Sequence, residues 1–482
     1  MAEPDVWDLL IVGAGLSGIG LGYYLGRDLP TLRYQILEAR ESLGGTWDLF
    51  RYPGIRSDSD LYTFGYEFKP WTSEKSIADG ASILQYLKDT ASEFGIDRHI
   101  QYQTKVLSAS FDSTEALWTV ELEHAGIRSI KKAKWIFSAA GYYNYEQGYT
   151  PNIPGLDRFK GRVIHPQHWP EDADFTGKRI VVIGSGATAV TLVPALASKA
   201  QHVTMLQRTP TYILSQPAVD KVAQGVRKLL PERLAHRVIR QKNIRLSRFI
   251  WRFCMRYPKA AKNIIQKGIQ KQLKADVAVE KHFNPPYNPW QQRLCLVPNG
   301  DLFKALNRGK AAVVTDEIEG FDESEVVLKS GARIQADWVI TATGLNLQTF
   351  GGVQLFVDQK LVEPNDCVAF KGMMLSDVPN MAFAIGYTNA SWTLKVGLLC
   401  EHLCRLLSYM DQHGFKHVRP KLPSPNMPTR ALLDFGAGYV KRSLDRLPRQ
   451  GFDEPWLMSM DYLKDVKTLR KGVVADPNLE FR

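Results

Sequence analysis

Two glycine-rich turns, each directly after a short apolar run, constrain this chain more than any other feature of its sequence. The first (GAGLSG, residues 13–18) follows Val6–Val12, and the second (GSGATA, residues 184–189) follows residues 178–183. Such apolar runs are typical of buried parallel strands, and the residues after each turn have helical character. A strand–turn–helix unit presents backbone N–H groups at a helix N-terminus, where a phosphate binds. The sequence therefore predicts two dinucleotide-binding units in one α/β chain.

The first unit has the full pattern of a dinucleotide site. The first glycine permits the tight turn, the second lets backbone approach a pyrophosphate, and the third allows close packing of helix on strand. A second strand, expected over residues 33–37, ends at Glu38, twenty residues after the turn, where an acid accepts ribose hydroxyls. The predicted binding residues here are Gly13, Gly15, Leu16, Ser17, Gly18 and Glu38.

The second unit differs at the tip of its second strand. The strand expected over residues 202–206 ends in Gln207-Arg208, with no acid. An acid there repels a 2′-phosphate, whereas a guanidinium can pair with one, so we expect NADPH here and FAD in the first unit. A plain surface charge is the alternative for Arg208. The other predicted binding residues are Gly184, Ser185, Gly186, Ala187 and Thr188.

These features predict an α/β fold with two Rossmann-type dinucleotide-binding domains, the second interrupted by a helical insertion. We also expect a helix over 83–94, strands near 101–111, 118–122, 135–139 and 337–341, and helices over 393–410 and 456–470. The expected segments are 1–150 (FAD-binding domain, first part), 151–177 (linker), 178–220 (NADP-binding domain, first part), 221–284 (basic helical insertion), 285–344 (NADP-binding domain, second part) and 345–482 (return to the FAD-binding domain and tail).

The insertion carries the basic character of the chain. Residues 221–282 hold 17 Lys and Arg but 3 Asp and Glu, a local net charge of +14 against +11 for the whole chain. Apolar residues recur at helical spacing, so we expect two or three helices interrupted at Pro231 and Pro258. A solvated helical face and peripheral contact with anionic lipid both remain open. Nucleic-acid binding is not expected, because no recognised module accompanies the charge.

Cysteine usage and hydropathy exclude several other classes of protein. The five cysteines contain no Cys-x-x-Cys pair, which argues against a dithiol reductase and a zinc site, so no metal is expected. No run approaches 18 apolar residues, and the N-terminus has no basic leader. We therefore expect a cytoplasmic protein, with contact at the inner face of the membrane left open.

The segment between the two units carries a family fingerprint. Its spacing, Phe-x-Gly-x3-His-x3-Trp-Pro, is filled by Phe159, Gly161, His165, Trp169 and Pro170. From Leu9 to about Met410 the chain resembles type I Baeyer–Villiger monooxygenases. The phrases GGTWDLFRYPGIRSDSD, HPQHWPED, YNPWQQRLCLVPNGDLF and GYTNASWTLK look most like their ethionamide-activating branch.

The resemblance implies a function and site residues. It implies an enzyme that uses FAD, NADPH and O2 to insert one oxygen atom next to a ketone carbonyl, giving an ester or lactone, and that also oxygenates sulfides or thioamides. Arg293 matches the catalytic arginine, which Asp58 would orient, and Gln292 stands where the family often has Lys. His165 and Trp169 would couple NADP binding to domain position. The expected flavin-lining residues are Gly45, Thr46, Trp47, Asp58, Val106 and Trp392, the first four in a loop (44–58) too rich in Gly, Pro and charge for regular structure.

Three rival functions stay in view. A flavin monooxygenase restricted to sulfur or nitrogen would share both dinucleotide turns. A two-nucleotide disulfide reductase would need the missing Cys-x-x-Cys pair. A non-catalytic nucleotide-binding protein could use the basic helices to reach a membrane.

Overall fold

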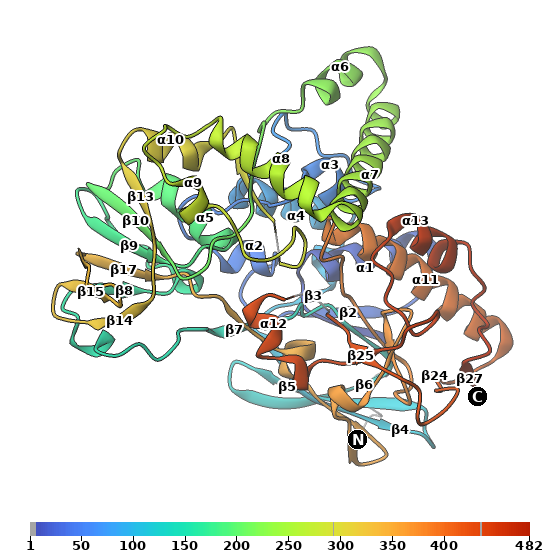
Figure 1. Ribbon diagram of the computed structural model, residues 1–482. Helices are drawn as coiled ribbons and strands as arrows, with labels where there is room; N and C mark the ends of the chain where they lie inside the picture. Colours follow the sequence, from blue (N-terminus) through green and yellow to red (C-terminus); the bar gives the residue numbers. More distant parts are fainter. Residues whose placement is uncertain (1–5, 293, 434–435) are drawn as a thin grey trace.

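The computed structural model describes residues 6–292, 294–433 and 436–482 (Figure 1). The larger of its two main sheets has nine strands in the order β20-β19-β4-β5-β6-β1-β2-β3, with β23 also paired to β6. These strands are β1 (Val6–Val12), β2 (Tyr34–Leu37), β3 (Ile100–Gln101), β4 (Thr104–Asp112), β5 (Leu117–His124), β6 (Ile127–Ser138), β19 (Gln354–Val357), β20 (Lys360–Leu361) and β23 (Met381–Phe383).

Strand β6 joins two kinds of pairing in this sheet. Its first half runs antiparallel to β5, and its second half runs parallel to both β1 and β23. Ile136 is opposite Leu10 on one side and Met381 on the other. The strand is therefore longer than the 135–139 predicted from its apolar end, because its exposed first half carries charged residues.

The second sheet has five strands, all parallel, in the order β13-β10-β9-β17-β8. Its edge strand β8 comes from the segment with the family fingerprint. The strands are β8 (Arg162–Ile164), β9 (Arg179–Ile183), β10 (His202–Gln207), β13 (Ala311–Thr315) and β17 (Trp338–Thr341), and a small antiparallel sheet adds β14 (Ile318–Phe321), β15 (Glu325–Leu328) and β16 (Arg333–Gln335).

The chain crosses between the two sheets along a two-stranded ribbon. Strand β7 (Tyr143–Gly148) leads from the first sheet toward the second, and β18 (Leu345–Leu347) leads back, antiparallel to β7. The part of the chain that forms the second sheet is thus inserted, in sequence, between strands of the first sheet. On the first sheet, α1 (Leu16–Asp28) packs with α11 (Trp392–His413), and on the second, α5 (Ala187–Leu196) packs with α10 (Asp301–Asn307).

The basic insertion begins with three long helices, α6 (Lys221–Leu229), α7 (Glu232–Arg256) and α8 (Pro258–Gln270), so the breaks fall at Pro231 and Pro258 as predicted. Of these, α6 and the adjoining end of α7 project from the body of the molecule (Figure 1). The inner face of α7 is buried on α3 (Leu61–Phe64), where the Arg240 guanidinium donates to the carbonyls of Tyr62, Thr63 and Gly65. Within the described ranges, no helix has the length and hydropathy needed to cross a membrane.

Two local predictions are wrong. The loop expected over 44–58 contains a one-turn helix, α2 (Thr46–Leu49), whose C-terminal half is buried. The helix expected from Trp456 begins later, at α13 (Tyr462–Asp465), because Asp461 caps it by accepting from the Leu463 N–H. The remaining elements are α4 (Gly80–Glu93), α9 (Val279–His282), α12 (Gly438–Lys441), β11 (Ile213–Gln216), β12 (Cys295–Pro298), β21 (Ala369–Phe370), β22 (Met374–Leu375), β24 (Val418–Pro420), β25 (Arg430–Ala431), β26 (Arg449–Gln450) and β27 (Leu479–Phe481).

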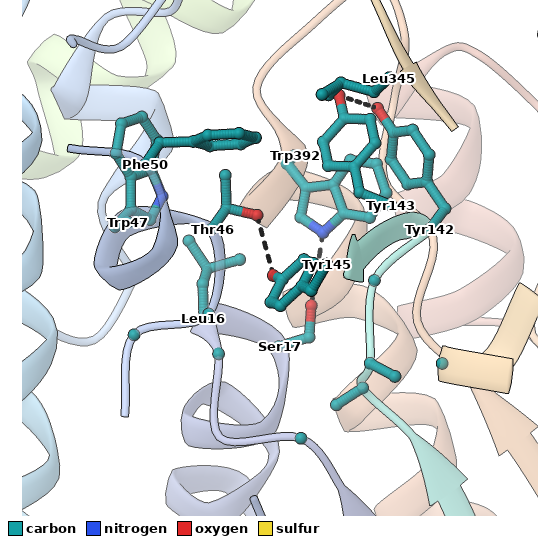
Figure 2. A pocket seen from close by; sticks show the side chains of 18 of the residues that line it. Leu16, Ser17, Thr46, Trp47, Phe50, Tyr142, Tyr143, Tyr145, Leu345 and Trp392 are labelled. Carbon is teal, nitrogen blue, oxygen red and sulfur yellow. Dashed lines mark hydrogen bonds between the residues drawn. The ribbon is translucent and has the colours of Figure 1, made fainter. Parts of the chain in front are cut away.

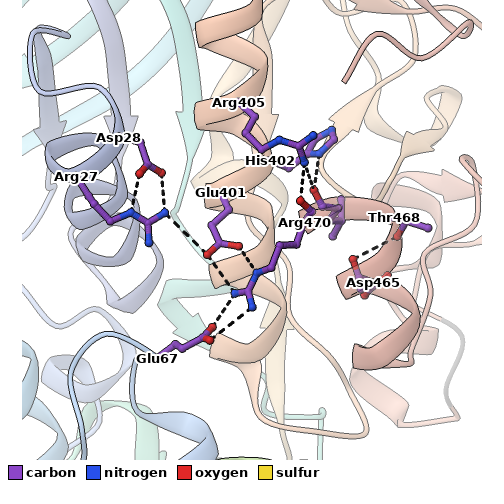
Figure 3. A network of polar contacts seen from close by, with 10 residues as sticks. Arg27, Asp28, Glu67, Glu401, His402, Arg405, Asp465, Thr468 and Arg470 are labelled. Carbon is purple, nitrogen blue, oxygen red and sulfur yellow. Dashed lines mark hydrogen bonds and ion pairs between the residues drawn. The ribbon is translucent and has the colours of Figure 1, made fainter. Parts of the chain in front are cut away.

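Polar contacts hold the C-terminal segment on α11 (Figure 3). The Arg470 guanidinium lies 2.7 Å from a Glu67 carboxylate oxygen and 2.5 Å from a Glu401 oxygen. Arg405 donates to the carbonyls of Leu469 and Arg470. These bonds satisfy carbonyls at the end of the π-helical turn Val466–Arg470, so the tail packs against α11 beside the larger sheet.

Candidate active site

One cavity of about 630 Å³ is lined by both dinucleotide units. Figure 2 shows its aromatic wall. The predicted residues that line it are Gly13, Gly15, Leu16, Ser17, Glu38, Gly45, Thr46, Trp47, Asp58, Val106, Ala187, Thr188 and Trp392. Those that do not are Gly18, Gly184, Ser185, Gly186, Arg208, Gln292 and the five fingerprint residues. Arg293, the predicted catalytic arginine, lies outside the described residues.

The first turn leaves backbone exposed to the cavity. Helix α1 begins after Gly15, and no side chain caps its first N–H groups. A Cβ added at Gly15 would lie 3.7 Å from the Gly45 Cα, an ordinary contact, and would enter the cavity both glycines line. A Cβ at Gly18 would instead lie 2.1 Å from the Gly13 carbonyl oxygen. Gly15 therefore faces the ligand space, and Gly18 keeps the turn closed on the helix.

Glu38 is fixed at the end of β2 with acceptor capacity to spare. Its carboxylate accepts from the backbone N–H groups of Ala14 at 2.7 Å and Arg40 at 2.9 Å. Burial raises the pKa of this carboxyl, and the two N–H donors oppose that rise. Two carboxylate oxygens offer about four lone-pair sites, so two remain for ribose hydroxyls.

Aromatic side chains from three segments enclose the cavity (Figure 2). The Trp392 indole N–H donates to Ser17 Oγ at 3.3 Å, and the Tyr142 ring stacks on Trp392 with centroids 5.2 Å apart. The Tyr145 hydroxyl lies 3.2 Å from Thr46 Oγ1. Burial raises the pKa of Tyr145 to about 12, so it remains a neutral phenol. The wall is therefore apolar and keeps its hydroxyls paired.

The second turn faces the same cavity through the first turn of α5. Gly186 is the N-cap residue, without a side-chain cap, and a Cβ there would meet no atom within 4 Å. At Gly184 a Cβ would lie 2.3 Å from the Ala342 carbonyl oxygen, and Ser185 Oγ donates to the Thr209 carbonyl at 2.8 Å. Arg208 is exposed just beyond β10. A guanidinium there is accessible to a phosphate at the mouth of this unit.

The loop after α2 rests directly on the second unit. A Cβ at Gly54 would lie 2.8 Å from the Ala195 Cβ and 2.9 Å from the Thr191 carbonyl oxygen of α5. The Arg56 guanidinium lies 2.5 Å from the Asp301 carboxylate at the start of α10. A segment of the first unit thus contacts the helix that opens the second.

The fingerprint residues are structural supports outside the cavity. Phe159 packs edge-on against Phe321, with ring centroids 5.8 Å apart. His165 Nδ1 accepts from the Gln167 N–H, so the proton resides on Nε2, which donates to the Gly344 carbonyl at 3.1 Å. Burial lowers the pKa of His165, so the ring is neutral. This bond ties β8 to the start of β18, where the chain returns to the first sheet.

Two further positions of the fingerprint, Gly161 and Trp169, also serve packing. A Cβ at Gly161 would lie 2.4 Å from the Asp337 carbonyl oxygen, so only glycine fits at this edge of the second sheet. Trp169, followed by Pro170, packs against the core of the second sheet. The fingerprint thus marks how the linker seats on the second unit.

Sequence reasoning missed several side chains of the cavity. Arg40, Tyr145 and Leu296 line it, yet none belongs to a dinucleotide turn. Tyr142 and Tyr143, in contrast, follow Gly141 just after β6, where the sequence indicates that the domain returns to its ligand, and both line the cavity. No group of three His, Cys, Asp or Glu able to hold a metal ion occurs in the part of the chain that the structure describes.

The two glycine-rich turns, on either side of the shared cavity, fit one dinucleotide each. Two uncapped helix N-termini can hold two pyrophosphates, and a buried acid and an exposed arginine match the two riboses. FAD would be held by Gly15, the backbone of Ser17 and Glu38, and NADP by Gly186, Thr188 and Arg208. The donors and acceptors of the two units thus agree with the cofactors predicted from the sequence.

Comparison with known proteins gives the same answer. Residues 75–388 match the family described as flavin-binding monooxygenase-like, and residues 11–71 match an NAD(P)-binding Rossmann-like domain. The chain is 52% identical to the FAD-containing monooxygenase EthA of Mycobacterium tuberculosis over 475 residues, which cover 98% of this chain and 97% of EthA. It is 49% identical to a probable FAD-binding monooxygenase, AlmA, of an Acinetobacter species, over 98% of this chain and 96% of AlmA.

Solved structures share the fold along the whole chain. A structure of OTEMO with FAD and NADP superposes with a TM-score of 0.76 at 21% identity, covering 100% of both chains. An oxidized steroid monooxygenase bound to NADP gives 0.77 at 22% identity, covering 99% of both chains. The predicted fold class and family are confirmed. The chain belongs to the flavin-binding monooxygenase-like family and is a flavin-dependent monooxygenase.

Proposed function

We propose that this monooxygenase is of the Baeyer–Villiger type. It combines a ketone with O2, NADPH and a proton, and gives an ester or lactone, water and NADP⁺. The observation that carries the proposal is the shared cavity reached by the N-terminal turns of both α1 and α5, because NADPH can then reduce a flavin within one site. The complete fingerprint from Phe159 to Pro170 supports the ketone-oxidising type over a monooxygenase restricted to sulfur or nitrogen.

The residues of the chain divide the work between binding and enclosure. When bound, FAD supplies the transfer of electrons from NADPH to O2. The N-terminus of α1 and Glu38 hold the adenosine diphosphate part by charge and hydrogen bonding. Trp392, Tyr142 and Phe64 form an apolar wall that excludes water. A dry site strengthens each electrostatic contact inside it, which favours oxygen transfer over release of hydrogen peroxide.

Arg293 and Asp58 complete the proposal. Asp58 lines the cavity, as does Leu296, three residues after Arg293 in the chain. A guanidinium keeps its charge in a desolvated site, so Arg293 can stabilise negative charge that develops on oxygen during attack on a carbonyl. Asp58 would orient it. Thioethers and thioamides can react in the same cavity.

The test is ester formed per NADPH consumed, measured over linear, cyclic and aryl ketones and thioethers. Arg293→Ala should still bind FAD and oxidise NADPH, but oxygen should leave as hydrogen peroxide in place of ester. Asp58→Ala should be milder, because Arg293 keeps its charge. Arg308→Ala, an exposed arginine on the same unit, is the matched control. An unchanged ester ratio in Arg293→Ala would remove Arg293 from this role, and no ester from the native enzyme would reject the Baeyer–Villiger assignment.

We also propose that the enzyme is cytoplasmic and that the outer face of the insertion contacts anionic lipid at the inner membrane surface. Of 18 exposed large apolar side chains among the described residues, 10 lie between residues 222 and 264, where Leu229 is 83% and Phe249 67% exposed. Exposed cations such as Arg245 and Arg256 alternate with them. Exposed apolar area and positive charge on the same helices are the two properties that bind a peripheral helix to an anionic bilayer.

Vesicle sedimentation tests this contact. The protein should bind phosphatidylglycerol-containing vesicles at low salt and dissociate from them at high salt. It should not bind vesicles of pure phosphatidylcholine. Phe249→Ser should weaken binding, whereas Ile127→Ser, a control that removes an equally exposed apolar side chain on β6, should not. Equal binding by both variants would exclude an apolar contribution from α7. An absence of binding at low salt would contradict lipid contact and favour the alternative that the insertion is a solvated helical face.

A further inference from the structure

A lysine, a carboxylate and a tyrosine are buried together behind one wall of the cavity. Lys395 Nζ lies 2.7 Å from Asp465 Oδ2, and the Tyr387 hydroxyl donates to the same oxygen at 2.5 Å. Lys395 is 1% exposed, Asp465 3% and Tyr387 4%. Tyr387 lines the cavity, whereas Asp465 and Lys395 are not among the described residues that line it. Of these three side chains, Tyr387 is therefore the one that contacts the cavity, and the two charged groups can influence the cavity through their contacts with it.

Stability does not account for this cluster. Lys395 lies in the first turn of α11, where the helix dipole disfavours a positive charge. Burial lowers the pKa of Lys395 and raises that of Asp465, because removing either charge from water is unfavourable. Apolar side chains of similar volume often replace a buried ion pair with no loss of stability. The pair is better explained by what it does to Tyr387.

The network turns the phenol proton away from the cavity. The Tyr387 hydroxyl has one hydrogen to donate, and it donates that hydrogen bond to Asp465, which is not among the described residues that line the cavity. Neighbouring groups of the same segment are also directed elsewhere. Thr388 Oγ1 donates to the Met460 sulfur at 3.8 Å, and the Asn389 amide donates to the Met460 carbonyl at 2.9 Å. Atoms of Met460 and Asp465, in the C-terminal segment, thus accept the hydrogen bonds that Tyr387, Thr388 and Asn389 donate.

A proton donor at this wall would change the chemistry of the enzyme. Attack on a ketone carbonyl needs an oxygen nucleophile that keeps its negative charge, and a proton delivered to it promotes loss as hydrogen peroxide. Oxygenation of a sulfide instead needs electrophilic oxygen, which protonation favours. We propose that Asp465, held by Lys395, is a positioning residue that keeps the Tyr387 proton out of the cavity and so favours ketones over sulfides. This inference rests on the proposed ketone oxygenation.

The test removes both charges together, so that no buried charge is left alone. The Lys395→Met, Asp465→Leu double variant should fold and bind FAD, but its ester per NADPH should fall about tenfold, the lower range for losing a hydrogen bond to a charged group. Hydrogen peroxide should rise to match, and sulfoxide per NADPH should hold or increase. Adding Tyr387→Phe should restore the ester, because the freed phenol is then absent. An unchanged ester ratio in the double variant, or no rescue by Tyr387→Phe, overturns the inference.

A second measurement does not depend on catalysis. Urea unfolding of the FAD-free protein can be followed for Tyr387→Phe and for the double variant, separately and combined. We expect the two changes to be non-additive, because both remove the same hydrogen bond to Asp465. Additive losses would show that the hydroxyl and the carboxylate are not coupled, which overturns the inference. Failure of the native enzyme to make ester would reject ketone oxygenation while this coupling stayed measurable.

Discussion

Single residues of the first dinucleotide turn differ in what an added methyl group would meet. Gly15→Ala should leave the fold intact but prevent FAD binding, since the methyl enters the ligand space and touches Gly45 only at 3.7 Å. Gly18→Ala should prevent folding of this unit, since the methyl would collide with the Gly13 carbonyl. Gly26→Ala, on the same helix with no atom within 4 Å, should stabilise the protein by about 0.5–1 kcal/mol.

Flavin absorbance per protein and far-ultraviolet circular dichroism separate these outcomes. The first variant should keep native dichroism and lose the yellow colour, and the second should lose both. Retention of stoichiometric FAD by Gly15→Ala would show that the pyrophosphate lies elsewhere. The Gly26→Ala control shows whether an alanine in α1 is harmful in itself.

Arg208 belongs to the same scale, because its proposed role is one charge-assisted contact. Arg208→Ala should raise the KM for NADPH about ten- to a hundredfold, which corresponds to roughly 1.5–3 kcal/mol for a hydrogen bond to a charged group. The KM for NADH should barely change, because NADH has no 2′-phosphate. Steady-state kinetics with both cofactors measure this. Equal increases in KM for the two cofactors would show that Arg208 does not bind the 2′-phosphate and is a plain surface charge.

Residues near a local signal could be predicted, and residues brought in by tertiary packing could not. Glu38 follows from its spacing after a glycine turn, and the structure places it on the cavity. Tyr145 and Leu296 share the same cavity but come from unrelated segments with no spacing rule. The fingerprint predicted the family correctly although its His165 supports the linker without lining the cavity.

Between elements, the contact of the 44–58 loop with α5 gives the sharpest prediction. Gly54→Ala should destabilise the protein by roughly 2–4 kcal/mol, because the position has φ +78° and the methyl would overlap Ala195 and the Thr191 carbonyl. Gly177→Ala is the matched control, with φ +69° and nothing within 4 Å, and should cost about 1–2 kcal/mol. Urea midpoints measure both. Equal losses would mean that the loop moves off α5 without penalty.

Elements with strong periodicity were predicted well, and short elements were not. Strand β1 matches its predicted range, and the three insertion helices break where proline removes a donor. Helix α2 was missed because Gly and Pro dominate its surroundings, and α13 starts six residues later than expected. Asp461, a preferred N-cap residue, was the available signal for the true start.

At the scale of the whole molecule, buried neutral histidines predict sensitivity to acid. Burial lowers the pKa of His402 to about 3 and of His236 to about 4, from an ordinary 6.5. Below about pH 6.5 the unfolded chain therefore binds protons at histidines that stay neutral in the folded protein. The free energy of unfolding has its full value above about pH 6.5 and falls as the pH decreases. Each of the two histidines should lower the free energy of unfolding by about 2 kcal/mol at pH 5.

Denaturant unfolding between neutral pH and about pH 5 checks this sign. His402→Gln, whose amide can still donate to the Leu469 carbonyl, should flatten the decline relative to the native chain. His99→Gln, which alters a partly exposed histidine, is the control and should leave the slope unchanged. A native slope that rises toward acid pH would contradict the assignment of neutral histidines.

The pairing of β23 with β6 has a consequence for how the protein is made on the ribosome. Met381 lies beside Ile136, so the FAD-side sheet stays open at this position until nearly four-fifths of the chain has been synthesised. All five strands of the second sheet lie between these two residues and can assemble earlier. The nascent chain would thus have its NADP-side sheet first, and a closed site for flavin only near the end of translation.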